Sequence, residues 1–391
     1  MPTASTAVTA PERIIVAMSG GVDSAVAALL LQRQGHDVQG LFMSNWEEDD
    51  SGYCTSAQDF QDARRVCEVL GISLHRVSFE REYRDRVFEY FLREYSAGRT
   101  PNPDVLCNRE IKFGACFDYA RRLGAQRVAT GHYARIERQE SRYTLCKARD
   151  LAKDQSYFLH GIDRSVLAHT LFPLGHLHKD EVRRIAREAA LPVFDKKDST
   201  GICFIGERPF RQFLATYLPA RPGRIRSADG REMGEHSGLM YYTLGQRHGL
   251  GIGGVADAPE EPWYVAGKDL ESNSLIVVQG HDHALLQSEA LRTEPVHWLL
   301  DPAGTEFRCA VKTRYRQADQ ACTVRLEGEW ATVTFERPQR AVAPGQFAVF
   351  YDRDICLGGA IIAATAPGGD FERPHAAAGP EPRARPAAGP N

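Results

Sequence analysis

Three short segments of the 391-residue chain carry residues whose types and spacing could do chemistry. The first is Ser19–Ser24, SGGVDS, which combines two glycines with hydroxyl and carboxylate side chains. Glycine tolerates positive φ and lets backbone amides come close to a ligand. Unpaired N–H groups at the start of a helix attract anions, and Ser19 and Ser24 add hydroxyl donors. The segment therefore predicts a cradle for a phosphate or a pyrophosphate.

The residues around this segment predict the strand and the helix that such a cradle needs. Ile14–Ala17 is a short apolar run with β-branched residues, which is typical of a buried parallel strand. Ala25–Leu31 is rich in helix formers, so a helix is expected to start near Asp23 and to end by Gly35. The G-x-x-x-x-G-K-[ST] pattern of the kinase-type loop is absent. The plainer interpretation is a tight turn that opens a Rossmann-like helix.

The second segment, Arg99–Phe113, reads RTPNPDVLCNREIKF. Its two prolines predict extended chain, and Cys107 is expected to open the helix that follows. A helix N-terminus and neighbouring cations such as Arg109 and Lys112 stabilise a thiolate. Asp104 lies in the same stretch and could exchange a proton.

The third segment, Asp195–Arg208, reads DKKDSTGICFIGER and places Cys203 in a glycine-flanked loop behind two lysines. Only the fold could bring Cys107 and Cys203 together, because they lie far apart in the sequence. Free cysteine is among the most buried residue types, so a structural role is the alternative for both. A metal or iron–sulfur site would need a clustered third ligand, which the sequence does not offer. Cys54 lacks a partner motif and is given no role. The remaining cysteines lie in periodic patterns and are expected in the core: Cys67, Cys116, Cys146, Cys309, Cys322 and Cys356.

Composition narrows the class of protein. A hydrophobic fraction of 43% supports real cores, and no apolar run approaches the length that spans a membrane. Nine cysteines without a C-x-x-C pair argue against a disulfide framework and the usual zinc pattern. The first residues show no export signal, so we expect a protein of the reducing cytosol. The net charge of −3 neither requires nor excludes nucleic acid, since local patches decide that.

Strands that alternate with helices predict a doubly wound parallel α/β sheet over residues 13–218. Such sheets bind ligands at the carboxyl ends of their strands. Short glycine-rich strands predict a small β-rich central domain over 219–282, and turn-separated strands predict a β-barrel over 283–365. The ends, 1–12 and 366–391, are expected to be disordered. The further strands and helices of the α/β domain are expected at Val38–Trp46, Ser56–Leu70, Ser73–Phe79, Arg81–Tyr95, Arg127–Ala129, Lys179–Leu191 and Pro209–Tyr217.

With these segments in view, the chain resembles the bacterial tRNA-specific 2-thiouridylases of the ATP pyrophosphatase superfamily. The resemblance spans about Arg13 to Ala364. The motifs that carry it, in order, are SGGVDS, GLFMSNW, GRTPNPDVLCNREIKF, ATGHYAR, KDQSYF, KKDSTGICFIGER, GLMYYTLGQRHGLGIGG, KTRYRQ and PGQFAVFY.

The resemblance implies a reaction in two stages. ATP, with Mg²⁺, adenylates the position-2 carbonyl of the wobble uridine in tRNAs for lysine, glutamate and glutamine. Sulfur from a cysteine persulfide then replaces AMP. Cys203 is implied to carry the persulfide, delivered by a relay that begins at a cysteine desulfurase. Cys107 is implied to release sulfide from it or to form a transient disulfide with Cys203, with Asp104 as acid/base. The implied ATP contacts are Ala17, Met18, Ser19, Gly20, Gly21, Val22, Asp23, Ser24, Met43 and Gly131.

A wobble base must leave its stacked loop to enter such a pocket, so further contacts to the RNA are needed. By resemblance, these tRNA contacts are Asn102, Pro103, Asp104, His132, Lys153, Asp154, Gln155, Arg314, Tyr315 and Gln346. Lys312, Arg314 and Arg316 are expected to alternate onto one face of a strand as a basic stripe for phosphates. A solvated strand face is the plainer interpretation of that stripe. A monomer is expected, because no interface stripe is visible.

Other functions explain fewer of these residues. An adenylating amidotransferase or synthetase acting on a small molecule would use SGGVDS but has no use for Cys107 or Cys203. A non-enzymatic RNA-binding or sulfur-carrier protein would not need an intact Ser19, Asp23 and Ser24. A 4-thiouridine synthase shares the chemistry, but the motifs downstream of Thr200 favour the 2-thiouridylase.

Overall fold

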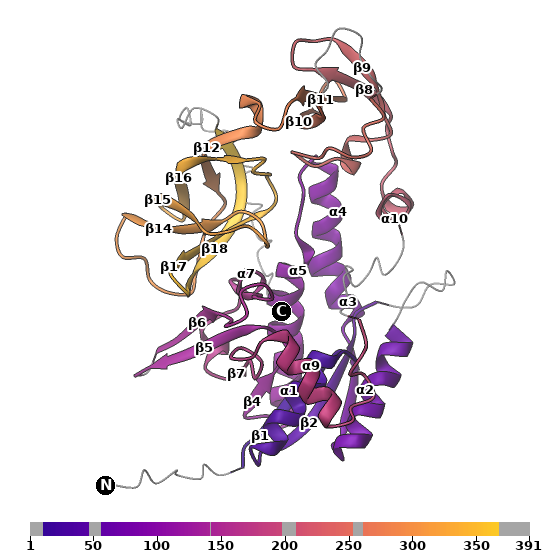
Figure 1. Cartoon of the computed structure of the whole chain (residues 1–391), viewed down its shortest axis with the longest axis vertical. Helices are drawn as coiled ribbons and strands as arrows, with labels where there is room; N and C mark the ends of the chain where they lie inside the picture. The colour runs from indigo at the N-terminus through magenta and orange to yellow at the C-terminus, as the bar shows by residue number, and fades with distance from the viewer. Residues whose placement is uncertain (1–10, 47–55, 141, 198–208, 253–260, 367–391) are drawn as a thin grey trace, which may run out of the picture.

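The computed structural model describes residues 11–46, 56–140, 142–197, 209–252 and 261–366. These residues form three sheets that follow one another along the long axis of the molecule (Figure 1). Cys54, Cys203 and residues 1–10 and 367–391 of the ends predicted to be disordered lie outside the described residues. Ala366, predicted to be disordered, is the last residue of strand β18 (Ile355–Ala366). None of the described helices is long and apolar enough to cross a membrane.

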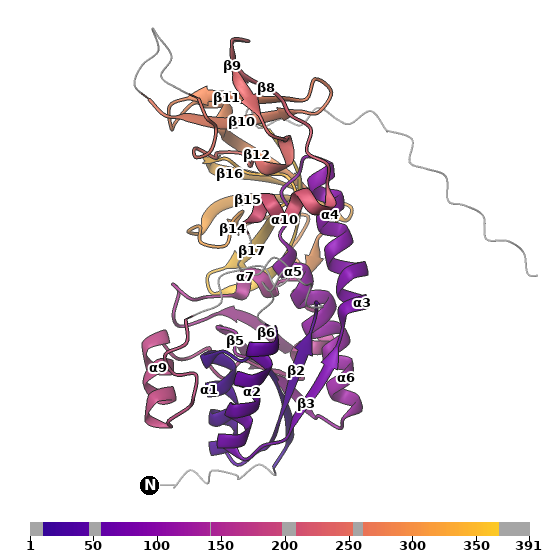
Figure 2. The same ribbon diagram turned by 90° about the vertical axis from the view of Figure 1, so that its right-hand side faces the viewer.

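The first sheet has five strands in the order β3-β2-β1-β4-β7, and every neighbouring pair is parallel. Alternate residues of the central strand face opposite sides: Ile14 and Val16 join one apolar cluster, and Ile15 joins the other. Helices α1 and α9 cover the first side and α6 covers the second (Figure 2). The predicted doubly wound sheet is confirmed. Its strands are β1 (Arg13–Met18), β2 (Asp37–Ser44), β3 (Leu74–Ser78), β4 (Arg127–Ala129) and β7 (Thr170–Leu171).

The helices of this unit largely follow the predicted bounds. Two helical stretches contain π-helical turns, η1 and η2, so that the chain from Glu80 to Ser96 is one helical arm. The helices are α1 (Val22–Arg33), α2 (Ser56–Leu70), α3 (Glu80–Tyr83), η1 (Arg84–Phe88), α4 (Glu89–Ser96), α5 (Pro103–Leu106), η2 (Cys107–Ala115), α6 (Cys116–Arg122), α7 (Ser156–Leu159), α8 (Arg164–Leu167) and α9 (Lys179–Glu188).

The second sheet is small and has the order β10-β11-β8-β9. Strands β11 and β8 are parallel, and the other two pairs are antiparallel. Its core is made by Ile225, Val265, Leu275 and Val277, all fully buried. The predicted β-rich central unit is therefore present. Helix α10 (Phe210–Tyr217) precedes it and packs Phe213 and Leu214 in the apolar cluster of the first unit, as predicted. The elements of the central unit are β8 (Gly223–Ser227), β9 (Glu232–His236), η3 (Leu239–Tyr241), β10 (Trp263–Asp269) and β11 (Ser274–Gln279).

The third sheet closes into a six-stranded barrel, as the sequence predicts, because β12 pairs with both β16 and β18. Closure leaves no unpaired strand edge in the ring. Val311, Val324, Val333 and Phe350 fill its core. The elements of this region are η4 (Ala284–Leu286), β12 (Gln287–Thr293), β13 (His297–Trp298), β14 (Glu306–Lys312), β15 (Gln320–Glu327), β16 (Trp330–Arg340), β17 (Phe347–Asp352) and β18 (Ile355–Ala366).

The predicted basic stripe on one strand face is wrong. Strand β14 ends at Lys312, and Arg314 and Arg316 follow in a turn. Thr313 causes the break, because its N–H and hydroxyl both donate to the side-chain oxygen of Gln317, at 2.8 and 2.9 Å. The strand alternation on which the stripe depended is therefore lost.

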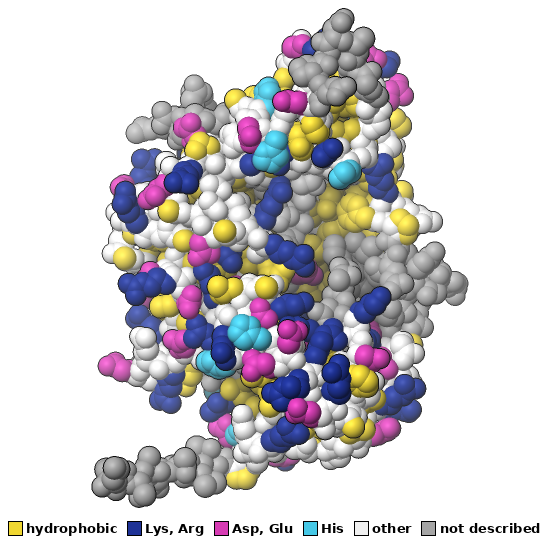
Figure 3. Space-filling model, viewed as in Figure 1, with side chains coloured by type: hydrophobic (Ala, Val, Ile, Leu, Met, Phe, Trp, Pro, Cys, Tyr) yellow, Lys and Arg dark blue, Asp and Glu magenta, His cyan; other side chains and the backbone are white. Residues whose placement is uncertain are grey.

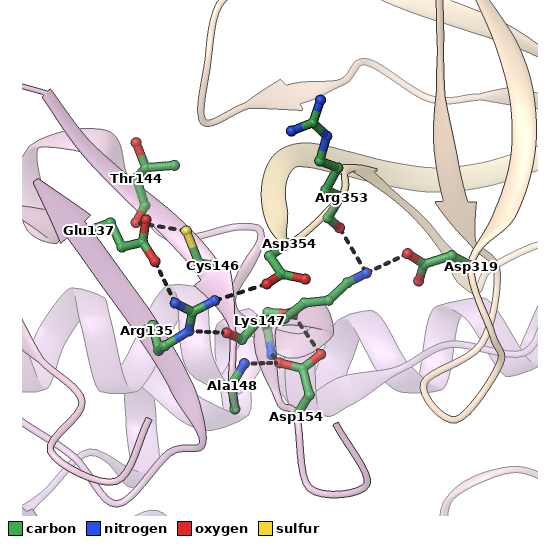
Figure 4. Close-up of polar contacts among 11 residues, drawn as sticks. Arg135, Glu137, Thr144, Cys146, Lys147, Ala148, Asp154, Asp319, Arg353 and Asp354 are labelled. Carbon is green, nitrogen blue, oxygen red and sulfur yellow. Dashed lines mark hydrogen bonds and ion pairs between the residues drawn. The ribbon is translucent and has the colours of Figure 1, made fainter. Parts of the chain in front are cut away.

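A hairpin of the first unit, β5 (Ala134–Gln139) and β6 (Arg142–Lys147), joins the barrel sheet through the pairing of Cys146 with Ile355. Figure 4 shows the polar contacts at this junction. The ammonium of Lys147 is buried, pairs with Asp319 and donates to the carbonyl of Arg353 at 3.0 Å. A buried charge with two partners fixes the barrel against the first unit.

His160 offers a test of the packing between these units. It is 2% exposed, contacts the carbonyl of Tyr157 through Nδ1 at 2.7 Å and lies 5.0 Å from the ring of Phe347. Burial lowers the pKa of His160 to about 4, against an ordinary value of about 6.5.

Between about pH 6.5 and pH 4, His160 is therefore protonated in the unfolded chain but stays neutral in the folded chain. The free energy of unfolding consequently falls as the pH drops from about 6.5 towards 4. We expect the melting temperature to fall over this range less steeply in His160→Gln than in the wild type, as measured by calorimetry. His248→Gln, at an exposed position, is the control and keeps the wild-type slope. Equal slopes in all three proteins would contradict the assignment.

Candidate active site

The predicted cradle has the expected strand–turn–helix form. Strand β1 ends at Met18 and α1 begins at Val22. The hydroxyl of Ser24 accepts from the N–H of Ser19 at 3.2 Å and donates to the carbonyl of Gly21 at 3.1 Å, which closes the turn. Gly20 has φ of +74°, and a Cβ there would lie 2.3 Å from the carbonyl oxygen of Asp59. Only glycine fits that position.

Two buried groups hold the carboxylate of Asp23 in the first turn of α1. The ammonium of Lys179 lies 2.8 Å from both carboxylate oxygens, and the hydroxyl of Tyr133 donates to Oδ1 at 2.8 Å. Sequence reasoning missed both partners. The sequence could have pointed to Tyr133, which stands in the ATGHYAR motif beside His132. For Lys179 the only indication was its place at the start of a predicted helix.

Lys196 supports the turn from the other side. Its ammonium donates to the carbonyl of Gly20 at 3.0 Å and contacts Asp59 at 2.7 Å and Asp62 at 2.6 Å. Burial lowers the pKa of Lys196, but the hydrogen bonds with the two aspartates outweigh burial and raise the pKa above its ordinary value. Lys196 therefore stays charged and ties α2 to the turn.

The predicted ATP contacts gather at one edge of the parallel sheet. Strands β2 and β4 flank β1, so their carboxyl ends lie beside the turn. Gly131 follows β4 and packs so closely that a Cβ would lie 2.7 Å from the carbonyl carbon of Asp23 and the nitrogen of Ser24. Met43 lies within β2, one residue before its end, inside the stretch predicted as a strand. The ladder with β3 extends to Ser44 and keeps Met43 in the strand.

His132 lies next to Gly131 and is enclosed by aromatic rings. Its Nδ1 forms a 2.7 Å hydrogen bond with the hydroxyl of Thr130, and the rings of Phe113 and Phe172 lie 6.0 and 6.1 Å away. Burial, with a smaller contribution from the charge of Lys112, lowers its pKa well below the usual range. His132 is therefore neutral at physiological pH.

Cys107, the cysteine of the second segment, does not open its helix as predicted. The helix begins at Pro103, and Asn102 caps it by accepting from the N–H of Asp104 at 3.2 Å. Asparagine at the cap and proline at the first position are strong start signals. Cys107 therefore lies in the second turn, at the start of η2, is 4% exposed and packs in an apolar cluster with Ile111. The helix terminus acts on it less than expected.

The charge of Lys112 acts on both Asp104 and His132. Asp104 keeps part of its surface exposed, but the surrounding protein desolvates its carboxyl group and raises its pKa, and the charge of Lys112 partly opposes this. The same ammonium helps to lower the pKa of His132. The rings of Phe113 and His132 lie 6.0 Å apart, so the segment that holds Cys107 packs beside the strand end at the cradle.

The partner cysteine, Cys203, lies outside the described residues, so its predicted approach to Cys107 stays a prediction. The expected core positions of the other cysteines are confirmed. Five are buried and Cys309 is partly exposed. These six are Cys67, Cys116, Cys146, Cys309, Cys322 and Cys356.

Several residues expected to touch tRNA have partners within the protein. The carboxylate of Asp154 is buried and accepts from the N–H groups of Ala148 and Ser156, at 3.0 and 3.2 Å. The side-chain oxygen of Gln155 accepts from the N–H of Tyr133 at 2.9 Å. These bonds shape the turn that presents Lys153.

The barrel-side residues are likewise engaged. Arg314 donates to the carbonyls of Leu244 at 3.1 Å and Ala341 at 2.7 Å. The ring of Tyr315 lies 4.3 Å from that of Phe158. Gln346 donates to the carbonyl of Thr100 at 2.9 Å.

A parallel α/β unit with this turn, joined to two β-rich units, defines an ATP-using enzyme of the ATP pyrophosphatase class. Residues 12–207 match the family described as "tRNA methyl transferase HUP domain". Residues 211–279 match "tRNA methyl transferase PRC-barrel domain", and residues 288–362 match "Aminomethyltransferase beta-barrel domain".

Full-length relatives identify the family. The chain is 60% identical over 354 residues to the tRNA-specific 2-thiouridylase MnmA of Methylococcus capsulatus, covering 89% of this chain and 95% of the relative. It is 56% identical over 371 residues to the enzyme of that name from Burkholderia multivorans, covering 94% and 97%. The chain belongs to the tRNA-specific 2-thiouridylase family.

The close packing of Gly131 against α1 generates a prediction. In Gly131→Ala the added methyl meets backbone atoms of Asp23 and Ser24, which cannot rotate away, so the cradle must open. We expect the KM for ATP to rise at least tenfold, measured by AMP formation. Gly267→Ala is the matched control, because its Cβ would meet only ordinary contacts at 3.6 Å. An unchanged KM in Gly131→Ala would show that the cradle lies elsewhere.

Proposed function

We propose that this enzyme adenylates the position-2 carbonyl of the wobble uridine in tRNAs for lysine, glutamate and glutamine, and then replaces AMP with sulfur. One observation carries the proposal. Gly131 packs on Asp23 of the cradle, and the ring of its neighbour His132 lies 6.0 Å from that of Phe113 in the segment of Cys107, which supports a single site. Membership of the 2-thiouridylase family supports the wobble uridine of tRNA as the substrate of that site.

The first stage uses the turn from Ala17 to Ser24. The carbonyl oxygen of uridine attacks the α-phosphorus of ATP, and pyrophosphate leaves into the cradle of backbone N–H groups and serine hydroxyls. Mg²⁺ would accompany ATP and neutralise phosphate charge, and Asp23 is the carboxylate of the cradle that could hold it. The contacts with Lys179 and Tyr133 keep that carboxylate in place.

The second stage uses the cysteines. The terminal sulfur of a persulfide on Cys203 attacks the activated carbon and AMP leaves with the electron pair of the carbon–oxygen bond. The thiolate of Cys107 then attacks Sγ of Cys203, which releases 2-thiouridine and forms a disulfide between the two cysteines. In the alternative order, Cys107 attacks first and releases sulfide. An external thiol reductant then restores both cysteines. Asp104, whose pKa burial raises, holds the proton that is exchanged.

The RNA is bound across the units. Asn102, Pro103 and His132 contact the splayed base beside Asp104, and Lys153, Arg314, Tyr315 and Gln346 contact the surrounding loop. Asp154 and Gln155 act by shaping the turn of Lys153. Figure 3 shows Lys and Arg side chains among Asp and Glu side chains in the region of α9, and these cations are proposed to meet backbone phosphates. The enzyme works in the cytoplasm as a monomer and takes sulfur from a relay protein or a cysteine desulfurase.

The test is a thiolation assay. Protein, Mg²⁺, ATP and a persulfide donor are mixed with unmodified lysine tRNA, and nucleosides are read by mass spectrometry. We expect 2-thiouridine from the wild type and at least a thousandfold less from Cys107→Ala and from Cys203→Ala, because each removes a reacting sulfur. Cys116→Ala, on the same helical stretch and in the same apolar cluster as Cys107 but without a proposed role in the reaction, keeps most of the activity.

The outcomes separate the alternatives. Adenylation of a small acceptor while the tRNA stays unmodified would contradict the proposal and support a small-molecule synthetase. RNA binding without any ATP turnover would point to a non-enzymatic protein. Sulfur at position 4 of uridine would indicate a 4-thiouridine synthase.

A further inference from the structure

The four residues Gly98–Pro101, here called the strut segment, precede the catalytic residues and are held by both β-rich units. From the barrel, the carbonyl of Pro344 accepts from the N–H of Thr100 at 3.1 Å. Gln346 donates to the carbonyls of Thr100 and Pro101, at 2.9 and 3.4 Å. A Cβ on Gly345 would lie 2.9 Å from the nitrogen of Thr100, so the two backbones are in close contact.

The central sheet grips the same segment. The ammonium of Lys268, on β10, donates to the carbonyl of Gly98 at 2.9 Å. The hydroxyls of Thr100 and Thr243 lie 3.3 Å apart. The strut segment therefore meets all three units, and the residue after it is Asn102, which caps the helix of Asp104 and Cys107.

Arg99 is the charged centre of this junction. Its guanidinium pairs with Glu94 of α4 and, at 3.2 Å, with Glu294 just after β12 of the barrel. Glu94 is 1% exposed, while Arg99 and Glu294 are each about one-third exposed. Arg99 thus joins the helical arm of the first unit to the barrel at the start of the strut segment.

Some buried polar atoms around the ion pair of Arg99 and Glu94 lack hydrogen-bond partners. Among the described residues, Oε2 of Glu94, Nε of Arg99 and the hydroxyl of Tyr90 are buried without a hydrogen-bond partner. Buried polar atoms that stay unsatisfied reduce what an ion pair contributes to stability. The cluster is therefore a weak source of stability but a specific constraint on where the strut segment lies.

We infer that Arg99 is a positioning residue. Its ion pairs with Glu94 and Glu294 hold the strut segment against the barrel, and the position of that segment fixes where Asp104 and Cys107 lie for sulfur transfer. The inference rests on the proposed function for the identity of the reaction. It does not involve ATP binding, because the cradle has its own anchors in Lys179, Tyr133 and Lys196.

The experiment compares Glu294→Gln, Arg99→Lys and their double variant with the wild type. In Glu294→Gln we expect kcat for thiolation to fall about tenfold, the KM for ATP to stay within twofold, and the melting temperature to match that of the control. The double variant is no slower than the slower single variant, because both changes break one link. Glu232→Gln is the control, since it removes an equal charge from an ion pair confined to β8 and β9.

A second readout does not depend on activity. Hydrogen exchange at the amides of residues 102–107 is faster in Glu294→Gln than in the wild type or Glu232→Gln. Unchanged exchange together with unchanged kcat would overturn the inference, as would a double variant slowed by the product of the single effects. A wild type that makes no 2-thiouridine would refute the proposed function, and the exchange result would still decide the role of Arg99.

Discussion

The carboxylate of Asp23 is the point on which the site depends. Lys179 and Tyr133 hold it. The N–H of Tyr133 donates to the side-chain oxygen of Gln155 at 2.9 Å, and the N–H of Gln155 donates to the carbonyl of Tyr133 at 2.7 Å. The turn of Gln155 is shaped by Asp154, whose other neighbour is Lys312 of the barrel at 3.9 Å. One connected set of polar contacts therefore runs from the first turn of α1 to the C-terminal barrel.

A second connection runs beside it on the other wall of the site. Lys112 lies in the π-helical stretch that begins at Cys107, and its charge reaches both Asp104 and His132. A π-helical turn is rare and is often found at functional sites, because it widens the helix and changes where side chains point. The packing of Gly131 on Asp23 and of His132 near Phe113 brings the cradle and the segment of Cys107, built from distant motifs, to the same edge of the parallel sheet.

Local signals in the sequence were enough for the cradle. Ser19–Ser24 forms its turn from neighbours five residues apart or fewer, and parallel pairing then brings Gly131 alongside. The sequence also contains the signal for the helix start, since Asn102 is a cap residue and Pro103 suits the first helical position. The prediction nevertheless placed the start at Cys107, because it was based on the cysteine.

What the sequence could not show depends on long-range contacts. Lys179 and Lys196 find partners 156 and 176 positions away, and although Lys196 stands in the KKDSTGICFIGER motif, no local pattern indicates the partners of either residue. Asp154 looks like a surface residue in KDQSYF, yet its burial follows from the hairpin and barrel that close over it. The turn at Arg314 replaced the expected strand because of a side-chain bond to Gln317, which alternation patterns do not register.

The hydrogen bond from Gln346 to the strut segment forms late during protein synthesis. Thr100 leaves the ribosome 246 residues before its partner. At about 5 to 20 residues per second, the strut segment waits about 12 to 50 seconds for that hydrogen bond. The nascent first unit can therefore complete the turn of Ser19–Ser24 while the helix of Asp104 and Cys107 still lacks its contact with the barrel, and a chain cut short before the barrel never acquires that contact.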